Sequence, residues 1–171
     1  VGATINIMIV AAKAEGTTII ENAAKEPEIV NVATFLNNMG ARISGAGTST
    51  IKIEGVETLH KCFHEVIPDR IEAGTFLCLA AINRSELLIK NVNVEHIIPA
   101  IDKLEEMGCK LKVDKNQIEI NAPKKLKAVD IKTMPYPGFP TDMQSVFSAM
   151  LTTAKGTSII VENIFENRFK Y

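Results

Sequence analysis

The chain has 171 residues, of which 46% are hydrophobic and 23% charged, and its formal net charge is -1. This composition is sufficient for a buried core and excludes a disordered chain. A nearly neutral chain lacks the clustered basic face that nucleic-acid binding requires, and no stretch approaches the roughly 20 apolar residues of a membrane span. We therefore predict a globular chain with no nucleic-acid partner and no membrane segment.

The first predicted element is a helix over 4–14, which is apolar on nearly all sides. Such a helix is expected to be buried on every side. Gly16 then provides a left-handed stop. The pattern that follows predicts a strand over 17–21, an amphipathic helix over 27–39, and a hairpin pairing 41–44 with 50–54.

A boundary is predicted between Ile67 and Pro68, after a predicted strand over 59–67. Asp69 then has the position of an N-cap for the next apolar helix. The elements predicted beyond it are a helix over 71–82, a strand over 86–90, a helix over 94–107, a hairpin of 110–113 with 117–121, a strand over 129–133 and an apolar helix over 143–154. Apolar helices that alternate with amphipathic ones suggest helices enclosed by sheets, which inverts the usual α/β barrel.

Internal repeats organise this order of elements. The segment 14–22 returns at 154–163, and a degenerate copy lies at 81–91. The period of roughly seventy residues is longer than that of solenoid repeats, so each unit is a small α/β layer. The third copy stops after its first strand, and Val1 stands at the start of a helix. We therefore expect a piece of a longer polypeptide.

The cysteines indicate a reducing compartment. Cys62, Cys78 and Cys109 are odd in number and have no C-x-x-C spacing, so we predict no disulfide framework and a cytoplasmic location. Cys62 and His64 would share one face of the predicted strand 59–67, as metal ligands can, but no further Cys or His cluster completes a site. We predict no metal and no cofactor.

Asp142 is the first candidate site residue. It lies in a sequence that fits a capping box, with Thr141 at the N-cap and Gln144 at the third helical position. One interpretation makes Asp142 a carboxylate that complements the helix dipole. The other makes it a site residue, because the proline-rich stretch 135–140 would hold its side chain rigidly at a helix end that faces an opening.

Arg168 and Gly2 are weaker candidates. Arg168 follows the third strand and either forms a surface ion pair with Glu166 or Glu162, or clamps a carboxylate in a bidentate manner. Gly2 precedes the first helix, where backbone N–H groups are accessible to a phosphate or another polar ligand.

Several long motifs together resemble one family of enzymes, the bacterial UDP-N-acetylglucosamine enolpyruvyl transferases (1-carboxyvinyltransferases). The resemblance extends over the whole chain. The segments that carry it are 26–30 (EPEIV), 38–56, 68–76 (PDRIEAGTF), 137–144 (PGFPTDMQ) and 165–169 (FENRF).

The resemblance implies a fold and a domain organisation. The fold is α/β, built from repeated βαβαββ units of the inside-out α/β barrel, or alpha-beta prism, with the active site in a cleft between two three-unit domains. Residues 1–67 would be the last unit of the first domain. Residues 68–171 would be one and a half units of the second domain, truncated, with an interdomain hinge at the boundary.

The resemblance also implies an activity. The family transfers the enolpyruvyl group of phosphoenolpyruvate to the 3-hydroxyl of UDP-N-acetylglucosamine and releases phosphate through a tetrahedral adduct, which is the first committed step of peptidoglycan synthesis. In this sequence Asp142 matches the carboxylate that contacts the sugar and serves as the base for its hydroxyl. Val1 and Gly2 match backbone contacts to the UDP moiety, Ile164 a contact to the nucleotide-sugar, and Arg168 an arginine near the carboxylate of phosphoenolpyruvate.

Other parts of the family's active site have no counterpart in this chain. They are a Lys–Asn pair that holds phosphoenolpyruvate, a mobile loop that carries the proton-donating Cys or Asp, and further phosphate-binding arginines; none of the three cysteines here aligns with that loop. The chain alone is therefore expected to be inactive.

Two alternatives remain open on sequence grounds. The related shikimate-pathway enzyme, 3-phosphoshikimate 1-carboxyvinyltransferase, would accept shikimate 3-phosphate instead. A DNA sliding clamp is also built from repeated α/β units, but its inner helices need a positive face, which the apolar helices here lack.

Overall fold

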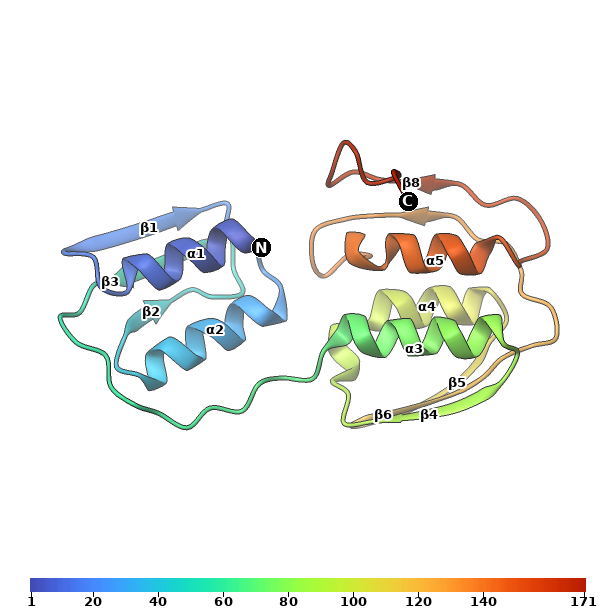
Figure 1. Ribbon diagram of the computed structural model, residues 1–171, viewed down its shortest axis with the longest axis horizontal. Coiled ribbons are helices and arrows are strands. Elements are labelled where there is room, and N and C mark those ends of the chain that lie inside the picture. The colour runs from blue at the N-terminus through green and yellow to red at the C-terminus, as the bar shows by residue number, and fades with distance from the viewer. The chain divides into compact units, whose positions relative to one another are not determined.

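The computed structural model describes residues 1–171, which form two compact units, Val1–Ile67 and Pro68–Tyr171 (Figure 1). The elements of unit 1 are α1 (Gly2–Ala11), β1 (Thr17–Glu21), α2 (Pro27–Asn38), β2 (Arg42–Ser44) and β3 (Thr50–Glu54). The three strands form one antiparallel sheet in the order β1-β3-β2. The predicted strand, amphipathic helix and hairpin are thus confirmed.

One face of this sheet packs against the two helices. The central strand β3 buries Ile51 and Ile53, which lie on the same face because side chains alternate along a strand. They meet Ile29 and Leu36 of α2 and Met8 of α1 in one apolar cluster. The apolar side chains of the amphipathic helix α2 therefore face the sheet, as the pattern predicts.

Unit 2 begins with the same arrangement. Its first elements are α3 (Arg70–Ile82), β4 (Glu86–Lys90), α4 (Ile98–Glu106), β5 (Lys110–Asp114) and β6 (Gln117–Asn121). The sheet order is β4-β6-β5, again antiparallel, so in each three-stranded sheet the strand that comes last in sequence is the central one. Asn22 and Asn91 both have positive φ, of 53° and 56°, just after the first strand of their unit. The predicted repeat is confirmed in topology and in this local conformation.

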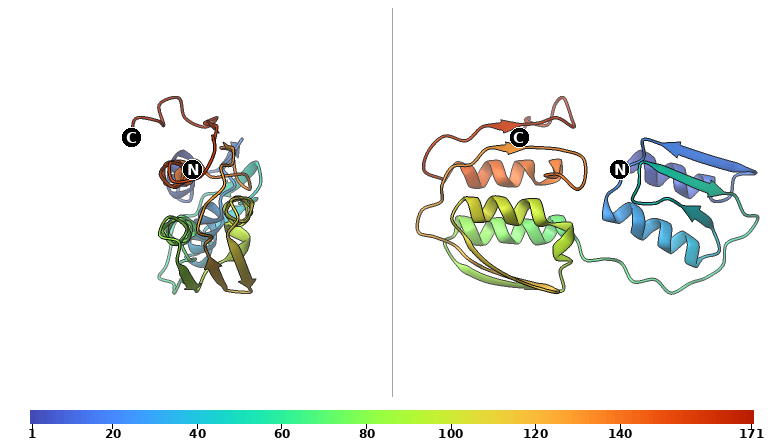
Figure 2. Two further views of the ribbon diagram at one scale, coloured as in Figure 1. Left: turned by 90° about the vertical axis from the view of Figure 1, so that its right-hand side faces the viewer. Right: turned by 180° about the vertical axis from the view of Figure 1, so that it is seen from behind.

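The third copy contributes β7 (Ile131–Lys132), a 3-10 turn η2 (Thr141–Met143), α5 (Gln144–Leu151) and β8 (Ile160–Val161). Strands β7 and β8 run parallel and are joined by the crossover that contains α5. Figures 1 and 2 show α3, α4 and α5 lying between the three-stranded sheet on one side and the β7–β8 pair on the other. Helices enclosed by sheets are what the alternation of apolar and amphipathic helices predicts.

The expectation that the first helix is buried on every side is wrong. Helix α1 buries Thr4, Met8 and Ala11, whereas Ile9 and Val10 are 50% and 73% exposed. Unit 1 has a single sheet and one further helix, so only one face of α1 has something to pack against. In unit 2 the equivalent helix α3 packs on both its sheet and α5, and it is correspondingly more buried.

The predicted strand over 59–67 is also wrong. This segment has no strand partner; its contacts with the rest of unit 1 include the His60 amide donating to the Met39 carbonyl at 2.8 Å and the His64 ring against Phe35 at 5.0 Å. No group of three or more His, Cys, Asp or Glu side chains is arranged to hold a metal ion. None of the helices combines the length and the apolar character needed to cross a bilayer.

Two further elements are shorter than predicted. The helix expected over 94–107 is a 3-10 turn, Val94–His96, followed by α4 from Ile98. Pro99 has no N–H to donate into the preceding turn, so a continuous helix is interrupted there. The strand expected over 129–133 is only Ile131–Lys132, although the Thr133 amide still donates to the Val161 carbonyl at 3.0 Å.

The three cysteines are free and should differ in reactivity. Burial raises the pKa of the Cys78 thiol strongly and that of Cys109 to about 11, so both stay protonated at pH 8. The thiolate is the nucleophile, and Cys62 is only partly buried. We expect iodoacetamide at pH 8 to alkylate Cys62 first and the other two only after denaturation, as measured by peptide mass mapping. Labelling of Cys78 in the native chain at the rate of Cys62 would contradict this, and a Cys62→Ser variant provides the control.

Candidate active site

A rigid loop and a buried methionine position the turn that carries Asp142. The loop between β7 and η2 contains a cis Tyr136–Pro137 bond and is closed by the Met134 amide donating to the Phe139 carbonyl at 3.0 Å. Met143, the last residue of η2, is fully buried against α3 at Gly74. A Cβ at Gly74 would lie 2.1 Å from the Met143 Cε, so a larger residue at this position would force the end of the Met143 side chain to move.

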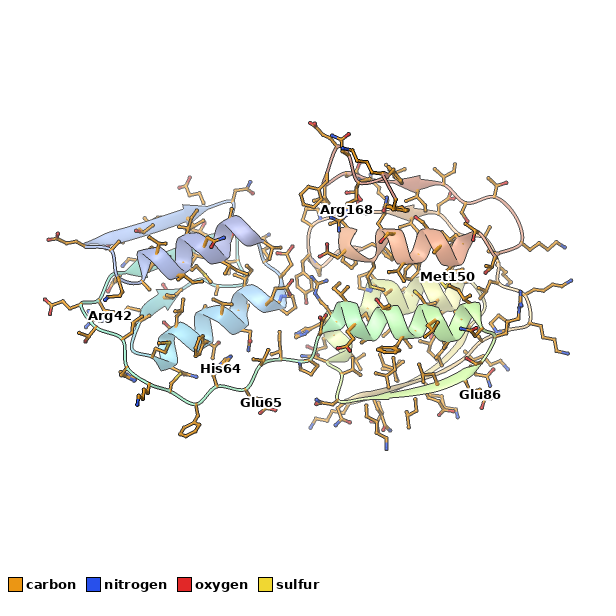
Figure 3. The ribbon with its side chains drawn as sticks, viewed as in Figure 1. Arg42, His64, Glu65, Glu86, Met150 and Arg168 are labelled. Atoms are coloured by element: carbon orange, nitrogen blue, oxygen red, sulfur yellow. The ribbon has the colours of Figure 1, made fainter.

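Asp142 and Arg168 form an ion pair. Arg168 Nη2 lies 2.6 Å from Asp142 Oδ1, and the two side chains are 37% and 53% exposed. Figure 3 shows Arg168 in the loop beyond β8, reaching back toward the start of α5. Its guanidinium also lies over the Phe165 ring, 5.4 Å from the centroid. The predicted surface pair of Arg168 with Glu166 or Glu162 is therefore wrong: its partner is the other candidate site residue.

The predicted capping box is wrong as well. Thr141 lies inside a 3-10 turn whose N-cap is Pro140, and its hydroxyl donates to Glu162 Oε2 at 2.9 Å instead of accepting from a helix amide. The Gln144 side chain accepts a hydrogen bond from the Tyr171 hydroxyl at 2.7 Å. Both side chains are thus engaged by residues more than twenty positions away, which a local motif does not reveal.

Glu162 is the centre of a hydrogen-bond network that sequence reasoning missed. Its Oε1 accepts from the amides of Ile164 and Phe165 at 2.8 and 3.1 Å, and its Oε2 accepts from Thr141. Burial acts to raise the pKa of this carboxyl, but these bonds and one from the Thr133 hydroxyl outweigh it and hold the pKa below its ordinary value. In the repeat pattern Glu162-Asn163 only copies Glu21-Asn22, so the sequence named Glu162 solely as a possible ion-pair partner of Arg168.

A second network holds the end of the same loop. Gln144 is fully buried at the start of α5, and Tyr171 bonds to both its side-chain oxygen and the Ser148 Oγ, the latter at 2.8 Å. Ser148 in turn donates to the Gln144 carbonyl at 2.8 Å. The segment that contains Arg168 is therefore attached at both ends, by Glu162 to the η2 turn and by Tyr171 to the start of α5.

The remaining predicted residues fall in two places. Ile164 is half-buried and lines an open depression together with Phe165, Glu166, Asn167 and Arg168. Val1 and Gly2 belong to unit 1, at the N-terminus of α1, where nothing lies within 4 Å of a Cβ placed on Gly2. Backbone N–H groups at a helix start are suited to an anionic ligand.

The Asp142–Arg168 pair indicates which chemistry this site can support. A carboxylate can accept a hydrogen bond or a proton from a substrate hydroxyl, and a guanidinium has N–H donors on three nitrogens, of which one contacts Asp142. Arginine binds carboxylates and phosphates through such donors. The arrangement fits a substrate pair that presents a hydroxyl next to an anionic group.

Comparison with known proteins shows the family. The family model described as EPSP synthase (3-phosphoshikimate 1-carboxyvinyltransferase) matches residues 1–171. The chain therefore belongs to this family, the enolpyruvyl transferases. It is 58% identical over all 171 residues to UDP-N-acetylglucosamine 1-carboxyvinyltransferase 1 of Caldanaerobacter subterraneus subsp. tengcongensis, and spans 41% of that protein. It is 54% identical over the same length to UDP-N-acetylglucosamine 1-carboxyvinyltransferase of Halothermothrix orenii, again spanning 41%.

A solved structure supports the same conclusion. The enolpyruvyl transferase NikO from Streptomyces tendae superposes with a TM-score of 0.83 and 27% sequence identity, covering 99% of this chain and 41% of that one. The α/β fold class expected from the resemblance is confirmed. The roles of the individual site residues stay predictions.

Proposed function

We propose that the protein to which this chain belongs transfers the enolpyruvyl group of phosphoenolpyruvate to the 3-hydroxyl of UDP-N-acetylglucosamine. The observation that carries the proposal is the contact of Asp142 with Arg168 at 2.6 Å, in a chain whose relatives bear the name of that activity at 53 to 58% identity. The family model also bears the name of the shikimate-pathway enzyme. The names of the curated relatives favour the nucleotide-sugar as acceptor.

The chemistry assigns one role to each member of the pair. The sugar oxygen bonds to C2 of phosphoenolpyruvate, and its proton passes to the Asp142 carboxylate as the bond forms. C3 gains a proton from a group outside this chain, giving a tetrahedral adduct. Loss of that proton and of phosphate restores the double bond. Arg168 binds the carboxylate of phosphoenolpyruvate through the N–H groups that Asp142 leaves available.

The other proposed contacts concern the nucleotide-sugar. The backbones of Val1 and Gly2 would bind the UDP moiety, as the resemblance implies, through N–H groups at the start of α1. Ile164 would contact the nucleotide-sugar from the edge of the depression next to Arg168. The common topology of the two units supports assigning residues 1–67 to the last unit of one domain and 68–171 to one and a half units of the next.

The cellular setting follows from the same activity. UDP-N-acetylglucosamine is the acceptor for the first committed step of peptidoglycan synthesis, which we propose takes place in the cytoplasm. Three free cysteines without a disulfide are consistent with a reducing compartment.

A graft tests the proposed function, because the 171-residue chain spans only 41% of its relatives. The chain replaces the matching segment of the Caldanaerobacter enzyme, and phosphate release from phosphoenolpyruvate is measured with UDP-N-acetylglucosamine, with shikimate 3-phosphate and with neither. We expect release only with the nucleotide-sugar, and none from the isolated chain.

The unmodified Caldanaerobacter enzyme shows that the assay works. Release by the graft that is independent of UDP-N-acetylglucosamine, or that requires shikimate 3-phosphate, would contradict the proposed acceptor. Turnover by the isolated chain would contradict the expectation that essential groups lie outside it.

A further inference from the structure

Asp142 and Arg168 are connected in space by a second link besides their own ion pair. They are 26 positions apart in sequence and lie on different elements, the η2 turn and the loop beyond β8. Glu162 Oε2 accepts the hydroxyl hydrogen of Thr141 at 2.9 Å, and Thr141 is the direct neighbour of Asp142. The first residue of the Arg168 loop thus holds the turn that carries Asp142.

The same carboxylate shapes its own loop. Glu162 Oε1 accepts from the amides of Ile164 and Phe165, which folds the chain into a turn just ahead of Arg168. One carboxyl group therefore uses one oxygen for each of the two segments. Losing it would remove this link and leave the segments joined by the exposed Asp142–Arg168 pair and the Tyr171–Gln144 bond, because the covalent chain between them passes through the whole of α5.

A buried anchor fixes the position of Glu162 itself. Thr133, which is fully buried after β7, accepts from the Asn163 amide at 2.9 Å, and its carbonyl accepts from Asn163 Nδ2 at 3.3 Å. Because the neighbouring residue is pinned in this way, the Glu162 side chain starts from a fixed backbone. Because Glu162 is held both at its backbone and at its carboxylate, it can keep Thr141 in a fixed position relative to the loop that carries Arg168.

The charge of Glu162 is met by hydrogen-bond donors and not by a cation. Arg168 contacts Asp142, whereas the Glu162 oxygens accept from the amides of Ile164 and Phe165 and from the Thr141 hydroxyl. A carboxylate satisfied by neutral donors leaves the guanidinium free for Asp142 and for an anionic substrate. Glu162 therefore helps to position Asp142 and Arg168 without forming an ion pair with Arg168 itself.

We propose that Glu162, acting through Thr141, is a positioning residue for enolpyruvyl transfer that keeps Asp142 and Arg168 at a fixed distance and orientation to each other. The inference rests on the function proposed above. Catalysis by such a pair depends on geometry, since a displacement of about 1 Å can lower a rate about 100-fold. Glu162 itself touches neither substrate.

The test uses the grafted enzyme with four variants: Glu162→Ala, Glu162→Gln, Thr141→Val, and the double variant Glu162→Ala with Thr141→Val. We expect Glu162→Ala to lower kcat/KM for phosphoenolpyruvate about 10- to 100-fold and Thr141→Val about 10-fold. The double variant should be no slower than Glu162→Ala alone, because both changes remove one shared bond.

Glu162→Gln should retain most of the activity. Its amide oxygen can still accept from Ile164 and Phe165, and its amide nitrogen can donate to the Thr141 hydroxyl. This rescue separates positioning from a need for charge. Glu106→Ala, which removes a surface pair with Lys103, is the matched control and should change kcat/KM less than about twofold.

Three results would overturn the proposal: unchanged kcat/KM in Glu162→Ala, effects of the two single changes that multiply in the double variant, or a Glu162→Gln enzyme as slow as Glu162→Ala. If Glu162→Ala does not fold, the pair Thr141→Val and Glu162→Gln decides in the same way, with melting temperatures within about 3 °C of the parent as the check on folding. A parent graft without UDP-N-acetylglucosamine-dependent release would instead show that the proposed function has failed.

Discussion

Replacing Asp142 with Asn in the grafted enzyme is expected to lower kcat by about 100-fold or more, since a positioned general base contributes about 10²- to 10⁴-fold. The amide has the size of the carboxylate and keeps an oxygen toward Arg168, which lies 2.6 Å away. It does not accept the proton of the sugar hydroxyl. The KM for phosphoenolpyruvate should change much less, because Arg168 remains in place. Phosphate release as a function of both substrates measures the two constants separately.

Asp102→Asn is the matched control for this change. Asp102 is exposed on α4, a different element from η2 and the loop beyond β8, so the kcat of this variant should equal that of the parent. If Asp142→Asn retains the parental kcat, Asp142 is an ion-pair partner of Arg168 and not the base. If kcat is unchanged but KM for phosphoenolpyruvate rises, the pair serves binding alone.

Replacing Phe147 with Ala is expected to destabilise unit 2 by about 3 to 5 kcal/mol, the usual cost of removing a buried phenyl ring. Phe147 is fully buried in α5, and its ring meets the Phe139 ring edge to face with centroids 4.9 Å apart. A loss of this size is a large part of the stability of a small domain. Because Phe139 belongs to the loop ahead of η2, the cavity left by Phe147→Ala would also loosen the packing that holds the turn with Asp142.

Urea unfolding of the chain measures this effect selectively. The two tyrosines, Tyr136 and Tyr171, both lie in unit 2 and the chain has no tryptophan, so tyrosine fluorescence reports the unfolding of that unit alone. Phe76→Ala on α3 is the control, since Phe76 is 46% exposed and its loss should cost less than about 1 kcal/mol. Equal losses for the two variants would mean that Phe147 is not part of a tightly packed core.

The elements of the fold were predictable because their signals are local. Pro27 at a helix start, alternating Ile51 and Ile53 on a strand, and Asp69 as an N-cap, where it accepts from the Ile71 amide at 2.7 Å, each express a short-range rule that the structure obeys. The repeat made the two sheets predictable as copies. The sequence itself singled out Asp142 and Arg168 as candidates, and the resemblance added their expected roles; their contact shows that the two side chains lie at one place.

The misses share a different cause, which is dependence on distant partners. The capping-box pattern at Thr141 is sound as a local rule, but Glu162 lies 21 positions away and takes the hydroxyl. The apolar pattern of α1 shows that every face of the helix could be buried, but it does not show which elements pack against the helix. The segment 59–67 alternates like a strand, yet no strand edge receives it. In each case a contact distant in sequence decided between two locally acceptable states.

The position of the last strand in each sheet sets an order of events during synthesis. Strand β3 pairs with both β1 and β2, and β6 pairs with both β4 and β5, so the central strand is the last one that the ribosome delivers. A nascent chain therefore holds β1 and α2 without a sheet until Glu54 has emerged. Each three-stranded sheet then forms in one late step, and the apolar helix that precedes it, α1 or α3, stays exposed longest.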